Sequence, residues 1–147
     1  MITMPPGITP AESGFGGIVW NILGQTYTLK QESEDSMAWH AVFPDGTFVP
    51  PHIHTTQDEF IYVLSGRYDL WIDGKDLVAK VGDLVRMPRG LPHGIFNKSG
   101  ATATSLFWVA PTRSLKGLFE RIHNVPDPAE VVRIAAEHDV NFLPPPA

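Results

Sequence analysis

The sequence predicts an all-β protein in which short strands form a sandwich or barrel, followed by a short helical tail. Runs rich in β-branched and aromatic residues recur between residues 18 and 109, and turn residues such as Gly24 and Asp45-Gly46 separate them. The Asp73-Gly74 pair predicts a tight hairpin, because glycine accepts the positive φ that such a turn requires. Only after Pro111 do apolar residues recur at helical spacing.

The strands follow one another closely along the chain. They are predicted at residues 18–23, 26–31, 37–43, 60–64, 68–72, 76–80, 84–87, 93–96 and 102–109. With 147 residues the chain fits one domain. We divide it into an extended N-terminal arm rich in proline and glycine (residues 1–17), the β-barrel (18–112) and a tail packed on the barrel (113–147).

The tail is predicted to contain two helices. Residues 114–123 place four apolar side chains along one helical face: Leu115, Leu118, Phe119 and Ile122. Residues 127–138 form the clearer helix, because Asp127 can cap it and Pro128 suits its first turn. The proline-rich residues 142–146 cannot continue a helix, so we expect an extended segment that packs back on the barrel.

The composition narrows the class of protein and of partner. The net charge is −5 and the lysines and arginines are scattered, which disfavours nucleic acid and anionic membranes as partners. No apolar stretch is long enough to cross a bilayer. The absence of cysteine fits a reducing compartment, and residues 1–17 show neither the basic start nor the apolar run of a signal peptide. We therefore expect a cytoplasmic protein.

Two blocks of the sequence place glycines at turns and histidines on the strands between them. The first block reads Gly46, five residues, His52, one residue, His54, four residues, Glu59, six residues and Gly66. The second block reads Gly82, five residues, Pro88-Arg89-Gly90, two residues, His93, three residues and Asn97. Together the blocks supply three imidazoles and one carboxylate, a ligand set for a divalent metal.

The spacing of the first block has a structural reason. His52 and His54 are predicted on the same face of a strand, because successive side chains alternate between faces. Pro50-Pro51 ahead of them suits the start or the edge of a strand and disfavours a helix. The polar residues 55–58 then turn the chain so that Glu59 opens the next strand, and this hairpin brings three ligands to one end of a sheet.

The fourth ligand, His93, belongs to a later strand and reaches the others only when the tertiary structure closes. Any one of these residues alone would be weak evidence, but the four at these offsets predict one divalent transition metal ion per chain. Imidazole and carboxylate ligands suit iron, nickel, manganese, cobalt or zinc, and thiolate ligands are excluded because the chain has no cysteine.

These two blocks match the two signature motifs of the cupin superfamily at every specified position, including the closing Asn97. The resemblance is strong over residues 46–97, about a third of the chain. The stretches 21–24 (NILG), 27–30 (YTLK) and 141–145 (NFLPP) also resemble single-domain cupins similar to quercetin 2,3-dioxygenase, whereas residues 139–141 (DVN) depart from that subgroup. The resemblance implies a cupin-type conical antiparallel β-barrel of two sheets with jelly-roll topology. It implies four metal ligands near the barrel mouth: His52, His54, Glu59 and His93.

Four protein ligands leave one or two open positions on a five- or six-coordinate metal, as a catalytic site requires. The resemblance implies a dioxygenase that combines dioxygen with a small hydrophobic or aromatic chelating substrate. A non-redox metal would instead polarise a carbonyl, as in a polyketide-cyclase-, isomerase- or lyase-like enzyme. A non-catalytic small-molecule- or metal-binding cupin is the third alternative. Glu59 is either only a ligand or also a general base.

An apolar substrate pocket is predicted inside the barrel, because barrel strands alternate inward and outward positions. Its candidate lining residues are Phe43, Phe48, Ile61, Met87, Phe96 and Trp108. A homodimer is also expected, since the apolar residues 18–20 would leave an exposed sheet edge in a monomer.

Overall fold

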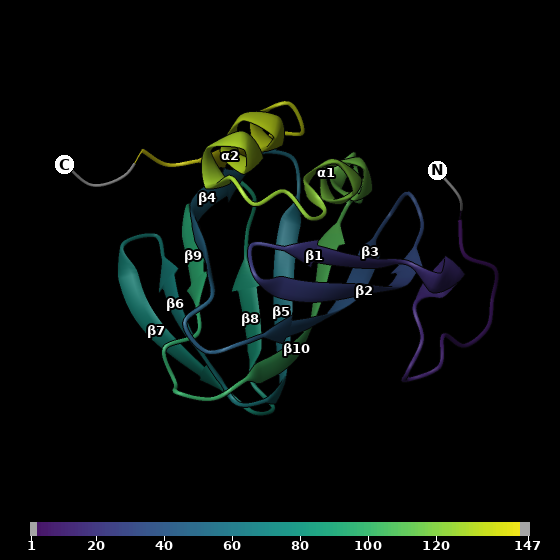
Figure 1. Cartoon of the computed structure of the whole chain (residues 1–147), viewed down its shortest axis with the longest axis horizontal. Coiled ribbons are helices and arrows are strands. Elements are labelled where there is room, and N and C mark those ends of the chain that lie inside the picture. Colours follow the sequence, from purple (N-terminus) through teal and green to yellow (C-terminus); the bar gives the residue numbers. More distant parts are fainter. Residues whose placement is uncertain (1–2, 145–147) are drawn as a thin grey trace.

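The computed structural model describes residues 3–144 and confirms an all-β protein with two antiparallel sheets and two helices (Figure 1). The six-stranded sheet has the order β1 (Val19–Ile22), β2 (Gln25–Glu32), β3 (Met37–Phe43), β10 (Ala103–Ala110), β5 (Asp58–Ser65) and β8 (Leu84–Met87). The five-stranded sheet has the order β11 (Val140–Phe142), β4 (Phe48–His54), β9 (His93–Phe96), β6 (Arg67–Ile72) and β7 (Lys75–Lys80). Residues 1–2 of the predicted arm and 145–147 of the predicted tail lie outside the described residues.

Alternating burial along the strands produces the core between the sheets. In β3 every second residue is buried, and β10, which pairs with it, alternates in the same way. The inward aromatic rings stack closely, with Phe43 and Phe107 almost parallel at a centroid distance of 5.8 Å. Such burial of large apolar side chains is the main favourable contribution to folding.

The turns follow the predicted chemistry. Asp73 and Gly74 join β6 to β7 with φ values of 47° and 85°, so both residues adopt the left-handed conformation of a two-residue hairpin. A short 3-10 helix, η1 (Phe15–Gly17), precedes β1, and the described residues before it contain neither strand nor helix.

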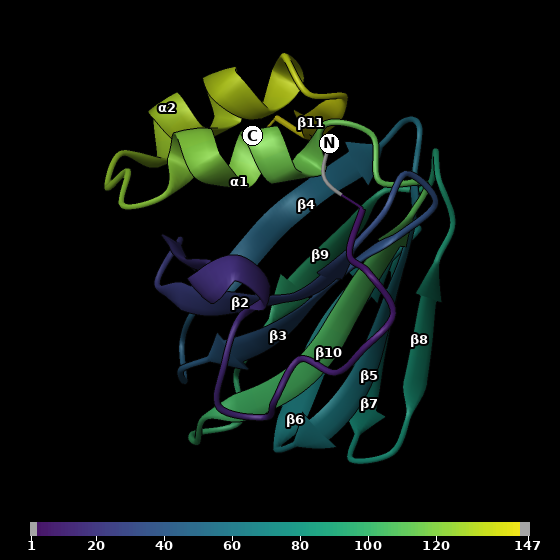
Figure 2. The same ribbon diagram turned by 90° about the vertical axis from the view of Figure 1, so that its right-hand side faces the viewer.

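Two helices cover one end of the barrel, above the strand ends in Figures 1 and 2. They are α1 (Leu115–Ile122) and α2 (Pro128–Ala136), close to the predicted ranges. Asp127 caps α2 as predicted, because its side chain accepts a hydrogen bond from the backbone N–H of Ala129 at 3.0 Å. The four apolar residues predicted on one face of the first helix are all buried.

One topological expectation is wrong. The strands that flank residues 55–57 do not form a hairpin in one sheet, because β4 belongs to the five-stranded sheet and β5 to the six-stranded sheet. The connecting loop crosses between the sheets, and its Thr55 backbone N–H donates to the carbonyl of Asp139, just before β11. The sequence of residues 52–64 shows which side chains of each strand share a face, but it does not indicate which other strand each one pairs with.

The proline pair lies at an irregular place in β4. The β4–β9 pairing shifts register between Val49 and His52, around Pro50 and Pro51, which lack the backbone N–H that a ladder needs. β11 pairs with β4 only at residues 52–54, beyond the prolines. In the described part of the chain, neither helix is long and apolar enough to cross a membrane.

Candidate metal centre

The four predicted ligands converge at the end of the barrel that the helices cover. His52 and His54 come from β4, His93 lies opposite His52 on β9, and Glu59 reaches across from β5 in the other sheet. All four side chains are buried, and each offers a ligand atom within 4.8 Å of the others. The closest contacts join Glu59 Oε1 to His93 Nε2 at 3.1 Å and Glu59 Oε2 to His54 Nε2 at 3.6 Å.

Two imidazoles are held in the tautomer that a metal ligand requires. His52 Nδ1 lies 2.8 Å from the carbonyl oxygen of Pro50, and His54 Nδ1 lies 2.9 Å from Oε1 of Gln57. Both oxygens only accept hydrogen bonds, so each Nδ1 carries the proton and each Nε2 keeps its lone pair. With the Glu59 carboxylate, these nitrogens fit a divalent transition metal. The buried Nδ1 of His93 has no hydrogen-bond partner among the described residues.

The electrostatics of the cluster favour a cation. Burial alone would raise the pKa of Glu59, but the charge of His54, the hydrogen bond and charge of His93, and the charge of His52 together lower it to about 2. Burial lowers the pKa of His52 well below its ordinary value, and the neighbouring histidines His93 and His54 lower it further. At neutral pH the cluster therefore presents an ionised carboxylate and a neutral His52, the protonation states that bind metal.

The metal-free protein is expected to lose stability as the pH falls below 6.5, the ordinary pKa of histidine. Because the folded-state pKa of His52 is depressed, the unfolded chain takes up a proton that the folded chain does not bind. Glu59 acts with the same sign at lower pH, between its ordinary pKa of 4.5 and its folded-state pKa of about 2. Urea unfolding midpoints measured between about pH 7.5 and pH 4 should fall on acidification.

The variant His52→Gln is the control for this pH dependence, since it removes one of the two groups. Its unfolding midpoint should fall less steeply just below pH 6.5 than that of the natural protein. An equal slope in the two proteins would contradict the assigned role of His52.

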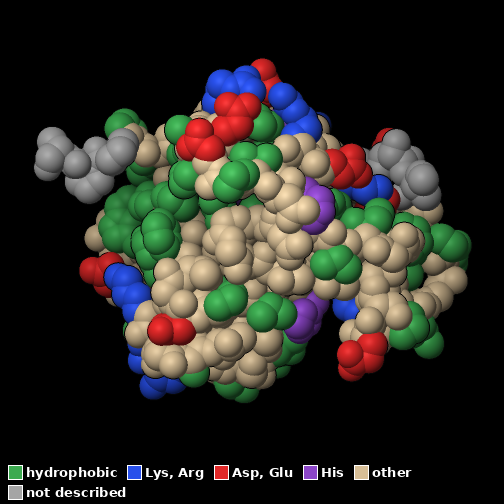
Figure 3. Space-filling model, viewed as in Figure 1, with side chains coloured by type: hydrophobic (Ala, Val, Ile, Leu, Met, Phe, Trp, Pro, Cys, Tyr) green, Lys and Arg blue, Asp and Glu red, His purple; other side chains and the backbone are tan. Residues whose placement is uncertain are grey.

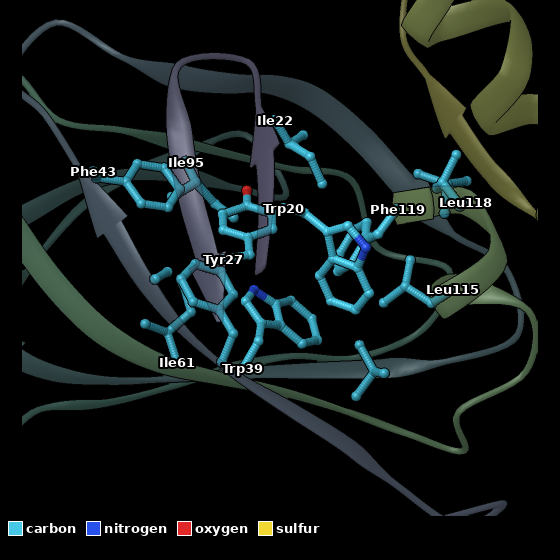
Figure 4. Packing of buried hydrophobic residues seen from close by; sticks show 14 of the residues in the cluster. Trp20, Ile22, Tyr27, Trp39, Phe43, Ile61, Ile95, Leu115, Leu118 and Phe119 are labelled. Atoms are coloured by element: carbon cyan, nitrogen blue, oxygen red, sulfur yellow. The ribbon is translucent and has the colours of Figure 1, made fainter. Parts of the chain in front are cut away.

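A cavity of about 50 Å³ lies against His52, His54 and Glu59. Its remaining walls are predominantly apolar, with Tyr27 and Trp39 as the polar exceptions. They come from both sheets (β1, β2, β3 and β10 of one, β4, β9 and β11 of the other) and from the two helices. In Figure 4 the rings of Tyr27, Trp39 and Phe119 lie together, below Ile22 and beside Leu118 of α1. No lysine or arginine of the described chain lines this cavity.

The cavity is not lined by the residues predicted for it. Phe43, Ile61 and Met87 point inward but are buried elsewhere in the core. Phe48, Phe96 and Trp108 were expected to point inward, and this is wrong: Phe48 is 48% exposed and stacks on Phe96 outside the barrel, while Trp108 stacks on Phe60.

Strand parity explains two of these three corrections, and a register shift explains the third. Phe96 and Trp108 each lie next to an inward residue, Ile95 and Phe107, and therefore face outward. Phe48 has the same parity as His52, but the register shift between them reverses its direction, so that its neighbour Val49 lines the cavity instead.

A larger groove on the outer face of the five-stranded sheet does not reach the four ligands. It has a volume of about 1220 Å³ and lies between α2 and the outer faces of β6, β7 and β9. Apolar side chains gather there on the left-hand side of Figure 3. The groove is separate from the metal cluster.

The sequence patterns missed three residues of the site. Gln57, Tyr27 and Trp39 are buried beside or close to the cluster. Gln57 could not be singled out because it lies among other polar loop residues. Tyr27 and Trp39 could not be distinguished from ordinary core residues of a strand. Burial raises the pKa of Tyr27 well above its ordinary value, and the Glu59 charge raises it further, so the phenol stays protonated.

Comparison with known proteins agrees with this fold and site. The family model described as Cupin domain matches residues 39–110. The pectin degradation protein KdgF of Dickeya dadantii is 30% identical over 78 residues, which cover 52% of this chain and 71% of that protein. The chain belongs to the cupin family.

Solved structures show the same fold. KdgF from Halomonas sp. superposes with a TM-score of 0.58 at 22% identity, covering 63% of this chain and 84% of that chain. An RmlC-like cupin from Shewanella frigidimarina superposes with a TM-score of 0.62 at 21% identity, covering 73% and 96% of the two chains. At these sequence identities the similarity shows a shared barrel fold and does not identify the substrate.

Proposed function

We propose that the protein is a metal-dependent dioxygenase that acts on a small hydrophobic or aromatic chelating substrate. The observation that carries this proposal is the position of the four candidate ligands: three of them, His52, His54 and Glu59, form a polar part of the wall of an otherwise predominantly apolar cavity, and the fourth lies beside them in the same cluster. Such a cavity favours apolar molecules over water, and dioxygen and aromatic compounds are apolar. The resemblance of residues 21–24, 27–30 and 141–145 to quercetin 2,3-dioxygenase-like cupins supports the same class.

A redox-active metal held by the four ligands would supply the electron transfer that lets a substrate react with dioxygen. The residues of the chain have two further tasks. Glu59 is ionised, so it can take the proton that an enol or phenol loses on binding. The apolar walls around Tyr27 and Phe119 keep bulk water away from the reacting groups.

Substrate entry requires the cavity to enlarge. About 50 Å³ holds only a few water molecules, whereas a cavity of about 150 Å³ is needed for one benzene ring. Two walls are the helix α1, through Leu115, Leu118 and Phe119, and the strand pair β1–β2. We propose that α1 moves when substrate binds.

A non-redox reaction on a carbonyl substrate is the second candidate, because KdgF, a pectin degradation protein, is the curated relative with 30% identity. Pectin is an acidic polysaccharide, and recognition of a sugar carboxylate usually employs arginine or lysine. The described residues place neither type in the cavity wall. The cavity wall therefore gives no support to a pectin-derived acidic substrate at this site.

Oxygen consumption tests the proposal. Metal-free protein is loaded separately with iron, nickel, manganese, cobalt or zinc and mixed with flavonols, catechols and 1,3-diketones in an oxygen-electrode cell. We expect substrate-dependent oxygen uptake with at least one redox-active metal and none with zinc. Glu59→Gln should abolish the uptake, whereas Asp58→Asn, which changes the neighbouring carboxylate paired with Arg89 at the surface, should retain it.

The other outcomes point to the other classes. Substrate turnover that continues without oxygen would replace the dioxygenase with a Lewis-acid enzyme. A metal-loaded protein that binds these compounds without converting them would be a binding cupin.

The homodimer stays a prediction. β1 forms one edge of the six-stranded sheet, and Val19 on it is exposed in the described single chain. We propose that a second copy covers this edge, since natural sheets usually protect such strands.

A further inference from the structure

Gln57 connects a metal ligand to the segment that leads into the helices. Its side chain is 3% exposed, and Oε1 lies 2.9 Å from Nδ1 of His54. Its Nε2 lies 3.1 Å from the carbonyl oxygen of Pro111 and 2.7 Å from that of Thr112. These two carbonyls belong to the junction between β10 and α1.

The contacts determine which way the Gln57 amide faces. A backbone carbonyl can only accept, so the NH₂ group must face Pro111 and Thr112, where both of its hydrogens are used. The amide oxygen is therefore left to face His54, and it too can only accept. His54 must then carry its proton on Nδ1, and its Nε2 directs a lone pair toward Glu59 and the other ligands.

The junction that orients Gln57 is itself held in place. Thr112 is fully buried, its backbone N–H donates to the carbonyl of Glu34 at 3.1 Å, and its hydroxyl donates to the carbonyl of Ser33. Both acceptors lie in the turn between β2 and β3. The amide of Gln57 is thus fixed by a frame outside the metal cluster, and the flip that would present NH₂ to His54 would lose both carbonyl contacts.

We propose that Gln57 is a positioning residue for the metal centre: it holds His54 as an Nε2 ligand and thereby sets the metal affinity. The inference rests on the proposed function only in that it requires the four-residue cluster to bind metal. His52 has an equivalent acceptor in the backbone carbonyl of Pro50, which no substitution removes. Gln57 is therefore the position where this effect can be measured.

The test is the affinity for Co²⁺, followed by the visible absorption of the bound ion and by calorimetric titration. Gln57→Leu removes the acceptor, and we expect the dissociation constant to rise by about 10- to 100-fold. Gln57→Glu keeps an oxygen facing His54 but loses the paired donation to the junction. It should bind Co²⁺ within about tenfold of the natural protein, although its melting temperature falls as in the leucine variant.

Ser105→Ala is the matched control for lost stability, because it removes a buried hydrogen bond between the hydroxyls of Ser105 and Tyr68, 2.7 Å apart and away from the cluster. It should lower the melting temperature and leave the Co²⁺ affinity and spectrum unchanged. A purely structural role for Gln57 would make affinity follow stability through all three variants, and this would overturn the inference. Unchanged affinity in Gln57→Leu would overturn it too, whereas a natural protein that binds no Co²⁺ would overturn the metal centre itself.

Discussion

His52→Ala is expected to abolish stoichiometric metal binding. The natural protein should contain about one first-row transition metal ion per chain, since the cluster presents one set of four ligands. Removing His52 takes away an imidazole whose tautomer is already set by Pro50. It also removes the ring that lies nearest to His93, at a centroid distance of 4.5 Å, and leaves an open space among the remaining donors. Elemental analysis of both proteins, grown in the same medium, measures the result.

His40→Ala is the control for this experiment. His40 is a histidine of β3 with a lowered pKa, due to partial burial and to the charge of Lys30, but it faces away from the core and is not part of the cluster. The His40 variant should keep its metal. Metal retained after His52→Ala would contradict the assigned ligands. No metal in either protein would contradict the metal centre itself and would make this barrel a candidate binding module.

The four-residue cluster could be predicted from the sequence only in part, because the constraints on His52 and His54 are local. His52 and His54 share a face through the two-residue period of one strand, and the glycines at positions 46, 66 and 82 mark turns. Strand positions were predictable for the same reason, and β3, β8 and β9 have the predicted bounds. That His93 lies opposite His52, with Glu59 facing them from the other sheet, depends on pairing between distant segments.

The cavity wall could not be predicted because it depends on one irregularity and one packing arrangement. The register shift near Pro50-Pro51 reverses Phe48 and Val49, and strand alternation alone gives no sign of it. The helices supply the remaining wall. Their apolar faces were evident in the sequence, but the pattern does not indicate which end of the barrel they cover. Gln57 was hidden for a related reason, since its partners are backbone carbonyls far along the chain.

Phe119→Ala is expected to cause a large loss of stability. The ring lies at centroid distances of 5.3, 5.3 and 5.1 Å from Trp20, Tyr27 and Trp39, and these contacts attach α1 to the barrel. Truncating a buried phenylalanine costs about 3–5 kcal/mol. In a chain of this length that corresponds to a fall in melting temperature on the order of 10 °C. Calorimetry of the metal-free protein measures it.

Phe60→Ala makes the same chemical change on the outer face of the six-stranded sheet, where Phe60 stacks on Trp108 at 5.1 Å. Losing this surface pair should cost only about 1 kcal/mol. Equal losses in the two variants would mean that α1 is not packed on the barrel as described.

The Phe119 variant should differ in a second way, because its missing ring enlarges the cavity beside the ligands. A small aromatic compound such as benzene should then raise the melting temperature of Phe119→Ala and leave that of Phe60→Ala unchanged. Since one ring both attaches α1 and fills the space beside the metal cluster, stability and room for substrate oppose each other in this protein.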